Sequence, residues 1–552
     1  METWRRTLVL QWSMLLAVVV GLPWFRGGYL LTYDMVWVPD LEPTRADVWG
    51  LGTALPRAVP SDGVVALLAS VVDPALLQRV VLLGALVLAG VGAGRAVRHL
   101  SVGARLAAAT LAIWNPFVAE RLVLGHWPLL VAYAALFWIV VGVREDRRAL
   151  TILALAATAL SPVSGIIGVV ALAVLSRGVV SALLLGAFVN APWITAAVLA
   201  DARPPDPAGV AAFAIQDEGP LGRVGSVLAL GGVWNTDVVP TSRGLTITTF
   251  VVLALWAVAV VGLVRLRHDD VRTATSLVVL GAVGVVVATL GWWGPDLLER
   301  GIDLFAPFAL LRDGTRWLAL LAPLQVIGLA HGVDALRERA GSAWWHLAPV
   351  VLAVLLPLAA LPDLANGVSG RVTPVEYPAE WTRAAQTVRA VDGPGDVLVL
   401  PFTAYRAPVW NEDRKVLDPA GRFFDRDTVT DDRLLVGRRW IAGEDPRAAQ
   451  VRQLLRGRAT RAELARTGIR LVVVDTSAPG GREAVQQTRG LRTLDRAGDL
   501  RVLAVRGARD RPIDPLDRAL VGGAWGLAGL VTLGGLVGVV RGAIASRRTR
   551  RG

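Results

Sequence analysis

Acidic and aromatic residues alternate in the segment that follows the first apolar run of the chain. Within residues 28–50 stand Asp34, Asp40, Glu42 and Asp47, interleaved with Tyr33, Trp37 and Trp49. A carboxylate at a membrane surface can act as general base toward a sugar hydroxyl, or hold a divalent cation against a phosphate. Aromatic side chains there can stack on sugar rings, but they also form ordinary interfacial belts. Two interpretations stay open: a site centred on Asp34, which lies closest to the apolar run, or a solvated acidic loop.

A second polar group lies in the sequence WNPFVAERLVLGHW, residues 114–127. His126 can transfer protons near neutral pH. Arg121 can bind a lipid phosphate through paired hydrogen bonds, and Glu120 can orient an acceptor. The alternative is structural: Glu120 and Arg121 form an ion pair, and Asn115 with the proline after it ends a helix.

The third group is the sequence FAIQDEGPLGRVGSVLALGGVWN, residues 213–235, with Asp217 and Trp234 as candidate binding residues. This segment reads either as an interfacial helix that covers a cleft or as a loop helix packed on the bundle. Segment 409–427 is also dense in charged and aromatic residues, a composition typical of a solvated surface loop.

The fourth group stands at the start of a late apolar run, in APFALLRDGTRWLALLAP, residues 306–323. Arg312 and Arg316 flank Asp313. Two arginines at a membrane surface can clamp a polyprenyl phosphate. They can equally cap and anchor the helix that follows, so both interpretations stay open.

The composition is that of an integral membrane protein. Of 552 residues, 54% are hydrophobic and 18% charged, whereas soluble domains carry about 25% charged residues. The chain has no cysteine, which excludes disulfides, zinc–thiolate sites and a cysteine nucleophile. Lys415 is its single lysine and no phosphate-binding G-x-x-x-x-G-K-[ST] sequence occurs, so ATP-driven transport is not expected. The net charge of +12 is ascribed to membrane topology and not to nucleic-acid binding.

About 20 apolar residues are needed to cross a bilayer. Runs near that length predict about twelve spans, at 7–24, 80–97, 104–118, 127–143, 150–161, 163–176, 179–199, 249–266, 274–293, 316–335, 345–362 and 518–540. The pair 150–161 and 163–176 is short and is interrupted by Ser161 and Pro162, so it is expected to form half-spans or tilted helices.

Arginine-rich connections recur on one side of these predicted spans. The positive-inside rule therefore places both termini in the cytoplasm of a multi-pass plasma-membrane protein. Residues 7–24 are expected to be a signal anchor, because no small-residue cleavage site follows them. Three large segments are then expected outside, at 25–79, 200–248 and 363–517.

The third outer segment has the pattern of an α/β domain. Strands are expected at 397–402 and 469–475, with a strand–turn–strand unit over 491–505. Helical patterns occupy 380–391, 446–457 and 460–467. The predicted fold class is thus mostly α: a polytopic helix bundle with an extracytoplasmic α/β domain. The predicted divisions are a membrane core at 1–362, the α/β domain at 363–517, and a last span with a basic tail at 518–552.

Four of these features together resemble a known family. They are the acidic loop after the first span, the element N-P-F-x-x-E-R-x-x-x-G-H-W, a second outer loop with G-G-x-W near its end, and L-x-R-D-G-x-R-W before a late span. The combination resembles multispanning envelope proteins of actinobacteria, similar to the arabinofuranosyltransferase membrane core and to YfhO-like proteins, within the GT-C glycosyltransferase class. The likeness covers about residues 1–362.

The resemblance implies an inverting transferase that uses a polyprenyl-phosphate sugar outside the membrane. Its key acid would be Asp34, with Asp40 next; no D-D or D-x-D pair is present in that loop, so a divalent cation stays an open possibility. An envelope glycan would be the acceptor, and residues 363–517 would bind that glycan or a protein of envelope synthesis. Two other classes stay open: a non-catalytic scaffold of an envelope-synthesis complex, and an exporter of lipid or polysaccharide.

Overall fold

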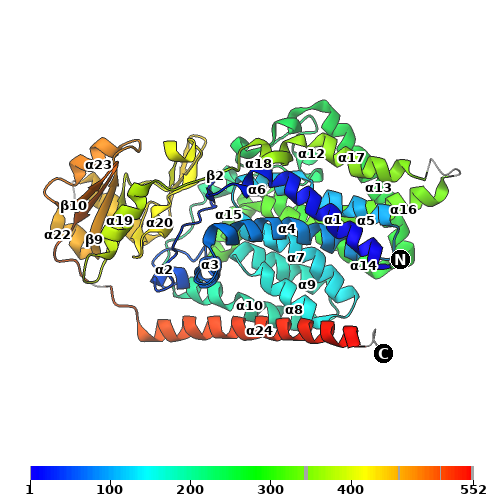
Figure 1. Cartoon of the computed structure of the whole chain (residues 1–552), viewed down its shortest axis with the longest axis horizontal. Coiled ribbons are helices and arrows are strands. Elements are labelled where there is room, and N and C mark those ends of the chain that lie inside the picture. Colours follow the sequence, from blue (N-terminus) through cyan, green and yellow to red (C-terminus); the bar gives the residue numbers. More distant parts are fainter. Residues whose placement is uncertain (1, 341–345, 458–459, 510, 549–552) are drawn as a thin grey trace.

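A computed structural model describes residues 2–340, 346–457, 460–509 and 511–548. Its helices run side by side along the long axis of the molecule, and an α/β region, residues 374–504, stands at one end (Figure 1). The two termini lie together at the opposite end. Residues 549–552 of the predicted basic tail and residue 345 of the predicted span 345–362 lie outside the described residues.

Eight helical segments in the described residues are long and apolar enough to cross a membrane. They are α4 (Pro74–Ala96), α5 with α6 (Val102–Ile113, Pro116–Val123), α7 (Trp127–Arg144), α10 (Val179–Leu199), α13 (Thr246–Asp269), α14 (Val271–Trp293), η5 with α16 (Gly314–Leu320, Leu321–Arg339) and α24 (Pro515–Arg548).

The count of about twelve spans is not confirmed. Four predicted ranges correspond to elements that fall short of the length required of a single straight span. Three are short apolar helices, within α1 (Glu2–Val20), α8 (Arg148–Thr158) and α9 (Pro162–Leu175). The fourth is α17 (Ala348–Ala360), after which the chain bends by 69° into η6 (Pro362–Leu364) and α18 (Ala365–Ser369). If the bent pair is one span, the count is nine.

The centre of the bundle is α16, which is buried along the whole of its apolar window and packs on α13, α14 and α5. Gly328 and Gly332 let the backbones of α16 and α13 approach closely. A Cβ atom on Gly332 would lie 1.9 Å from the carbonyl oxygen of Val258 on α13. Small residues four apart commonly permit such contact between membrane helices.

Substitution of Gly332 by alanine is therefore expected to force α13 and α16 apart. The overpacking should destabilise the protein by about 1–3 kcal/mol, measurable as a lower thermal unfolding temperature in detergent. Gly84→Ala is the matched control, because a Cβ at Gly84 on α4 would meet no atom within 4 Å apart from the nearby backbone of its own helix. Equal unfolding temperatures for the two variants would contradict the close packing.

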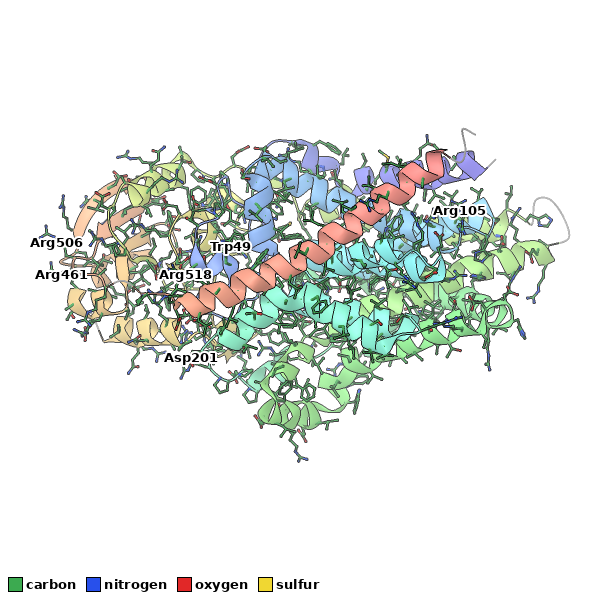
Figure 2. All side chains as sticks on the ribbon, turned by 90° about the horizontal axis from the view of Figure 1, so that it is seen from below. Trp49, Arg105, Asp201, Arg461, Arg506 and Arg518 are labelled. Carbon is green, nitrogen blue, oxygen red and sulfur yellow. The ribbon has the colours of Figure 1, made fainter. Side chains whose placement is uncertain are left out.

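The last helix, α24, lies along α8 and α10 on the outside of the bundle. Figure 2 shows it crossing the face of the molecule diagonally, beginning near Arg518 at the α/β end. Leucines on this helix, such as Leu530 and Leu533, are exposed, as expected for a surface that faces lipid. Trp525 packs edge-on against Trp49, with ring centroids 4.7 Å apart.

The α/β region is built on a five-stranded sheet in the order β10-β11-β9-β3-β6. Its strands are β3 (Asp396–Leu400), β6 (Thr428–Val429), β9 (Ile469–Asp475), β10 (Arg492–Ala497) and β11 (Leu500–Ala504). Strand β3 is parallel to β6 and β9, whereas β11 is antiparallel to β9 and β10. The predicted strands at 397–402 and 469–475 and the hairpin in 491–505 are confirmed.

The predicted helices of this region are also present, as α19 (Ala379–Arg389), α21 (Pro446–Arg456) and α22 (Arg461–Arg466). The region has two further short helices, α20 (Ala420–Phe423) and α23 (Gly481–Gln487). Two small hairpin-like pairs complete it: β4 (Tyr405–Arg406) with β5 (Val416–Leu417), and β7 (Leu434–Val436) with β8 (Arg439–Ile441).

The loop after α1 joins the bundle to the α/β region through main-chain hydrogen bonds. Strand β1 (Tyr29–Leu30) pairs antiparallel with β2 (Pro374–Val375). The Tyr33 N–H donates to the Lys415 carbonyl at 2.7 Å, and the Leu417 N–H donates to the Tyr33 carbonyl at 2.7 Å. The predicted acidic loop is thus fixed to the α/β region by backbone pairing.

The arginine-rich connections meet at the end of the bundle away from the α/β region. There Arg95 and Arg98 pair with Glu145, and Arg265 pairs with Glu338. The predicted orientation of the chain in the membrane depends on these arginine-rich connections.

Candidate active site

Asp34 is presented by a tight turn between the bundle and the α/β region. The Met35 N–H donates to the Thr32 carbonyl at 2.8 Å, and the Asp34 N–H donates to the Leu124 carbonyl at 3.0 Å. Tyr33, at the front of the turn, has a positive φ of 40°, a conformation that few non-glycine residues adopt. The side chain of Asp34 is 40% exposed.

Two side chains from distant parts of the sequence hold the carboxylate of Asp34. His126 Nε2 lies 3.1 Å from Oδ2, and the hydroxyl of Tyr405 donates to Oδ1. Burial by itself would raise the pKa of Asp34, but the hydrogen bonds from His126 and Tyr405 and the positive charge of Arg316 lower that pKa below its ordinary value. The group is therefore a carboxylate throughout the physiological pH range.

The neighbours of His126 fix its tautomer. Arg121 Nη1 lies 3.4 Å from Nδ1, and because a guanidinium can only donate, Nδ1 must accept. The proton is then on Nε2 and is directed at Asp34. Burial, followed by the charge of Arg316, lowers the pKa of His126, which favours this neutral form.

Arg121 is an internal residue and not part of the exposed surface. It lies at the C-terminal end of α6, is 1% exposed, and donates to Thr315 Oγ1 at 2.7 Å. Thr315 in turn donates to Asp313 at 3.0 Å, and Arg316 Nε donates to Asp313 at 2.6 Å. The second and fourth sequence groups thus meet beneath His126, where Arg121 supports the imidazole instead of facing a lipid phosphate.

A cluster of arginines adjoins Asp34 on the side of the α/β region. The charge of Arg316 lowers the pKa of Asp34, and the charges of Arg57 and Arg316 both act on Tyr405. Arg312 Nη2 donates to Glu444 at 3.0 Å, and Arg57 donates to the other oxygen of Glu444. The site therefore has an acid–base end at Asp34 and a cationic end, which is the arrangement needed to bind a phosphate beside a reacting hydroxyl.

The remaining predicted candidates lie outside this arrangement. Asp40 is exposed and paired with Arg389 at 3.0 Å, and Asp217 is exposed with Arg223 at 3.7 Å. Trp37 is buried against Trp127, with centroids 5.4 Å apart. Trp234 packs on Phe213, so it serves the fold of loop 213–235.

Glu120 lies on the opposite face of α6 from His126. Its side chain is fully buried beside Glu218, and a Cβ on Gly231 would approach both carboxylates. Glu218 accepts from the Val233 N–H at 2.9 Å and from Arg243 Nε at 3.3 Å. These contacts fix Glu218 within the loop that carries α12 (Gly222–Leu228) and to Arg243 before α13, which favours the structural interpretation of that segment.

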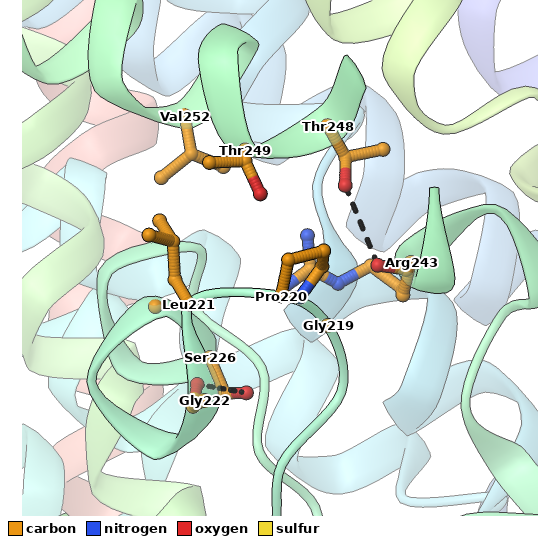
Figure 3. Close-up of a pocket in the computed structure, with 10 residues that line it drawn as sticks. Gly219, Pro220, Leu221, Gly222, Ser226, Arg243, Thr248, Thr249 and Val252 are labelled. Carbon is orange, nitrogen blue, oxygen red and sulfur yellow. Dashed lines mark hydrogen bonds between the residues drawn. The ribbon is translucent and has the colours of Figure 1, made fainter. Parts of the chain in front are cut away.

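Two cavities flank Arg243, with empty volumes of about 220 and 430 Å³. Figure 3 shows the smaller one, between the loop around Pro220 and residues Thr248, Thr249 and Val252 of α13. The lining residues of neither cavity include Asp34, His126 or Tyr405. Within the described parts of the chain, no group of three or more histidine, aspartate or glutamate residues is placed to hold a metal ion.

Comparison with known proteins yields a match at the level of structure. No family model and no curated protein matches the sequence. The structure of arabinofuranosyltransferase AftD from Mycobacteria, determined by cryo-electron microscopy, superposes with a TM-score of 0.57 at 17% identity, over 93% of this chain. The chain shares the fold of one part of AftD. A mutant of that enzyme gives a TM-score of 0.56 at 16% identity.

The resemblance to AftD is partial in length, because this chain spans 40% of the AftD chain, and 42% of the mutant chain. The predicted resemblance to the arabinofuranosyltransferase membrane core is confirmed as a likeness of fold. The eight long apolar helices in the described residues are those of a multi-pass membrane protein.

Sequence reasoning missed the residues that the α/β region contributes to the site. Tyr405 lies 371 positions from Asp34, within a short strand that has no distinguishing motif. Arg57 and Glu444 were likewise not singled out. No local signal marks them, since their role depends on which loops the fold brings together.

Tyr405→Phe should move the acid limb of activity to higher pH. The mutation removes a hydrogen bond that lowers the pKa of Asp34, so the carboxylate becomes protonated at higher pH and the base is lost earlier on acidification. The pH dependence of kcat/KM reports this change in the free enzyme. Tyr377→Phe is the control, because the hydroxyl of Tyr377 donates its hydrogen bond to the Trp37 carbonyl instead of to Asp34. Superimposable profiles for both variants would argue against the Tyr405–Asp34 contact.

Proposed function

We propose that this chain is a glycosyltransferase that moves a sugar from a polyprenyl-phosphate donor to a cell-envelope glycan or glycolipid, on the outer face of the plasma membrane. The observation that supports it is the joint placement of Asp34, His126 and Tyr405 next to the arginine cluster. The likeness of fold to an arabinofuranosyltransferase agrees with this assignment. Both termini would be cytoplasmic, and residues 363–517 would form an outer domain.

In the proposed reaction the acceptor hydroxyl reaches the exposed side of Asp34. Its oxygen attacks the anomeric carbon of the donor, the bond from that carbon to the phosphate oxygen breaks, and the configuration inverts. The hydroxyl proton passes to Asp34, and the polyprenyl phosphate leaves with the electron pair of the broken bond. The hydroxyl becomes more acidic as the new bond forms, so a carboxylate of low pKa can accept the proton late in the step.

The protein contributes orientation and charge to this step. The neutral imidazole of His126 and the hydroxyl of Tyr405 orient the carboxylate of Asp34. The acceptor hydroxyl donates a hydrogen bond to this carboxylate in the complex, along which its proton passes to Asp34. The arginine cluster would stabilise the phosphate as negative charge builds on it, and Arg316, whose charge acts on Asp34, would add to the positive field there.

The proposal is tested with the purified chain in lipid nanodiscs. Polyprenyl phosphates that carry arabinofuranose, mannose or galactofuranose would be supplied with oligosaccharide acceptors, and free polyprenyl phosphate and glycosylated acceptor would be quantified. Equal release of the two products is expected with one donor. Absence of both products with every donor, from protein that is folded, would favour the scaffold.

A further inference from the structure

Glu444 joins four segments of the chain at the cationic end of the site. Its carboxylate accepts hydrogen bonds from Arg57, in the loop before α3 (Ser61–Ala69), and from Arg312 at 3.0 Å, between η4 (Ala306–Leu311) and η5. Its own carbonyl accepts from the Arg203 N–H at 2.8 Å. The side chain is 3% exposed, so the α/β region inserts a buried carboxylate between two arginines of the membrane part.

Two arginines, Arg57 and Arg312, share the single carboxylate of Glu444. Arg312 has a buried Nη1 with no hydrogen-bond partner among the described residues, and its guanidinium stands 5.5 Å from the ring of Phe213. Arg57 is 60% exposed at its side chain. One carboxylate therefore leaves the pair with net positive charge, an open face and an unused donor.

A carboxylate held by two guanidinium groups has the geometry in which arginines also bind a phosphate. Burial would raise the pKa of Glu444, but the charges of Arg57 and Arg312 keep it below its ordinary value, so the group is anionic. In charge and in hydrogen-bond acceptors, Glu444 takes the place that an anionic ligand would occupy.

We propose that Arg57 and Arg312 form the binding site for the phosphate of the lipid donor, and that Glu444 fills this site in the ligand-free chain as an internal competitor. The proposal rests on the transferase function given above. Donor binding then exchanges the Glu444 carboxylate for the donor phosphate, and the loop 442–445 has to withdraw.

The same loop is tied both to the membrane part and to the rest of the α/β region. The Ala442 N–H donates to Asp206 at 2.7 Å, and the Asp445 N–H donates to Asp432 at 2.7 Å. Asp445 also caps α21. Withdrawal of Glu444 therefore moves the loop between β8 and α21. Binding of a phosphate at this site is then coupled to the position of the α/β region next to Asp34.

The test measures binding of a polyprenyl monophosphate without sugar to the full chain in nanodiscs. Glu444→Gln keeps the size of the side chain but removes its charge, so it should bind this probe about five- to tenfold more tightly. Arg312→Gln should weaken binding by about tenfold or more. Asp431→Asn is the matched control, because Asp431 is also a buried carboxylate between two arginines, Arg433 and Arg452, but inside the α/β region.

Unchanged or weaker binding by Glu444→Gln, with folding comparable to that of Asp431→Asn, would overturn the proposal and leave Glu444 as a structural partner of the two arginines. Unchanged binding by Arg312→Gln would also overturn it. Because the probe carries no sugar, these results do not depend on catalysis. Failure of the transferase assignment itself would instead appear as absence of product in the transfer assay.

Discussion

Asp34→Asn should lower the rate of transfer by a factor of about 10² to 10⁴, the contribution typical of a general acid or base. The amide has nearly the same shape as the carboxylate but cannot accept the acceptor's proton. Because the loss concerns the chemical step, it should appear in kcat, with the KM for the donor changed little. The measurement is the initial rate of polyprenyl-phosphate release at saturating donor and acceptor.

Asp40→Asn provides the control for this prediction. Asp40 stands in the same loop, but it is exposed and pairs with Arg389 on the surface, so its substitution should leave the rate nearly unchanged. Retained membrane insertion and an unchanged unfolding temperature would show that Asp34→Asn is folded. Full activity of a folded Asp34→Asn protein would remove Asp34 from the role of base.

Arg121→Gln should destabilise the protein by about 3–5 kcal/mol, the usual cost of removing one partner from a buried charge network. Arg121 is 1% exposed. Its guanidinium donates a hydrogen bond to Thr315 and faces the buried Asp313 and the imidazole of His126. Without it, Asp313 loses a compensating charge and His126 Nδ1 loses its donor. A strongly lowered unfolding temperature is expected, together with loss of transfer.

Two further variants separate charge from geometry at this position. Arg121→Lys keeps the charge but lacks the planar fork that reaches Thr315 and His126 together, so it should recover part of the stability and little activity. Arg389→Gln removes an exposed arginine from a surface pair, which should cost at most about 1 kcal/mol. If Arg121→Gln were as stable as Arg389→Gln, the buried network would not be the support of His126.

Much of the site lay within the sequence groups, but the role of single residues did not. Asp34 and His126 were both candidates, and the fold places them 3.1 Å apart. Asp40 and Asp217 had the same residue type and similar neighbours, yet both are exposed surface acids. Residue type and spacing do not distinguish these cases, because burial and partner depend on segments that are far apart along the chain.

The sequence by itself determined the elements of this protein. Apolar run length fixed most of the membrane helices, and buried β-branched runs fixed strands β3 and β9. Apolar run length did not determine the number of spans, because three apolar helices are short and the chain bends by 69° after α17.

Only the tertiary structure decided what surrounds Asp34. Tyr405 and Glu444 reach the membrane part because the loop after α1 pairs with strands of the α/β region. Arg121 faces inward because the turn of α6 directs it toward Thr315, whereas its neighbour Glu120 faces Glu218 on the other side of the helix. Such placements arise from packing between segments far apart in the sequence, and a local sequence pattern does not predict them.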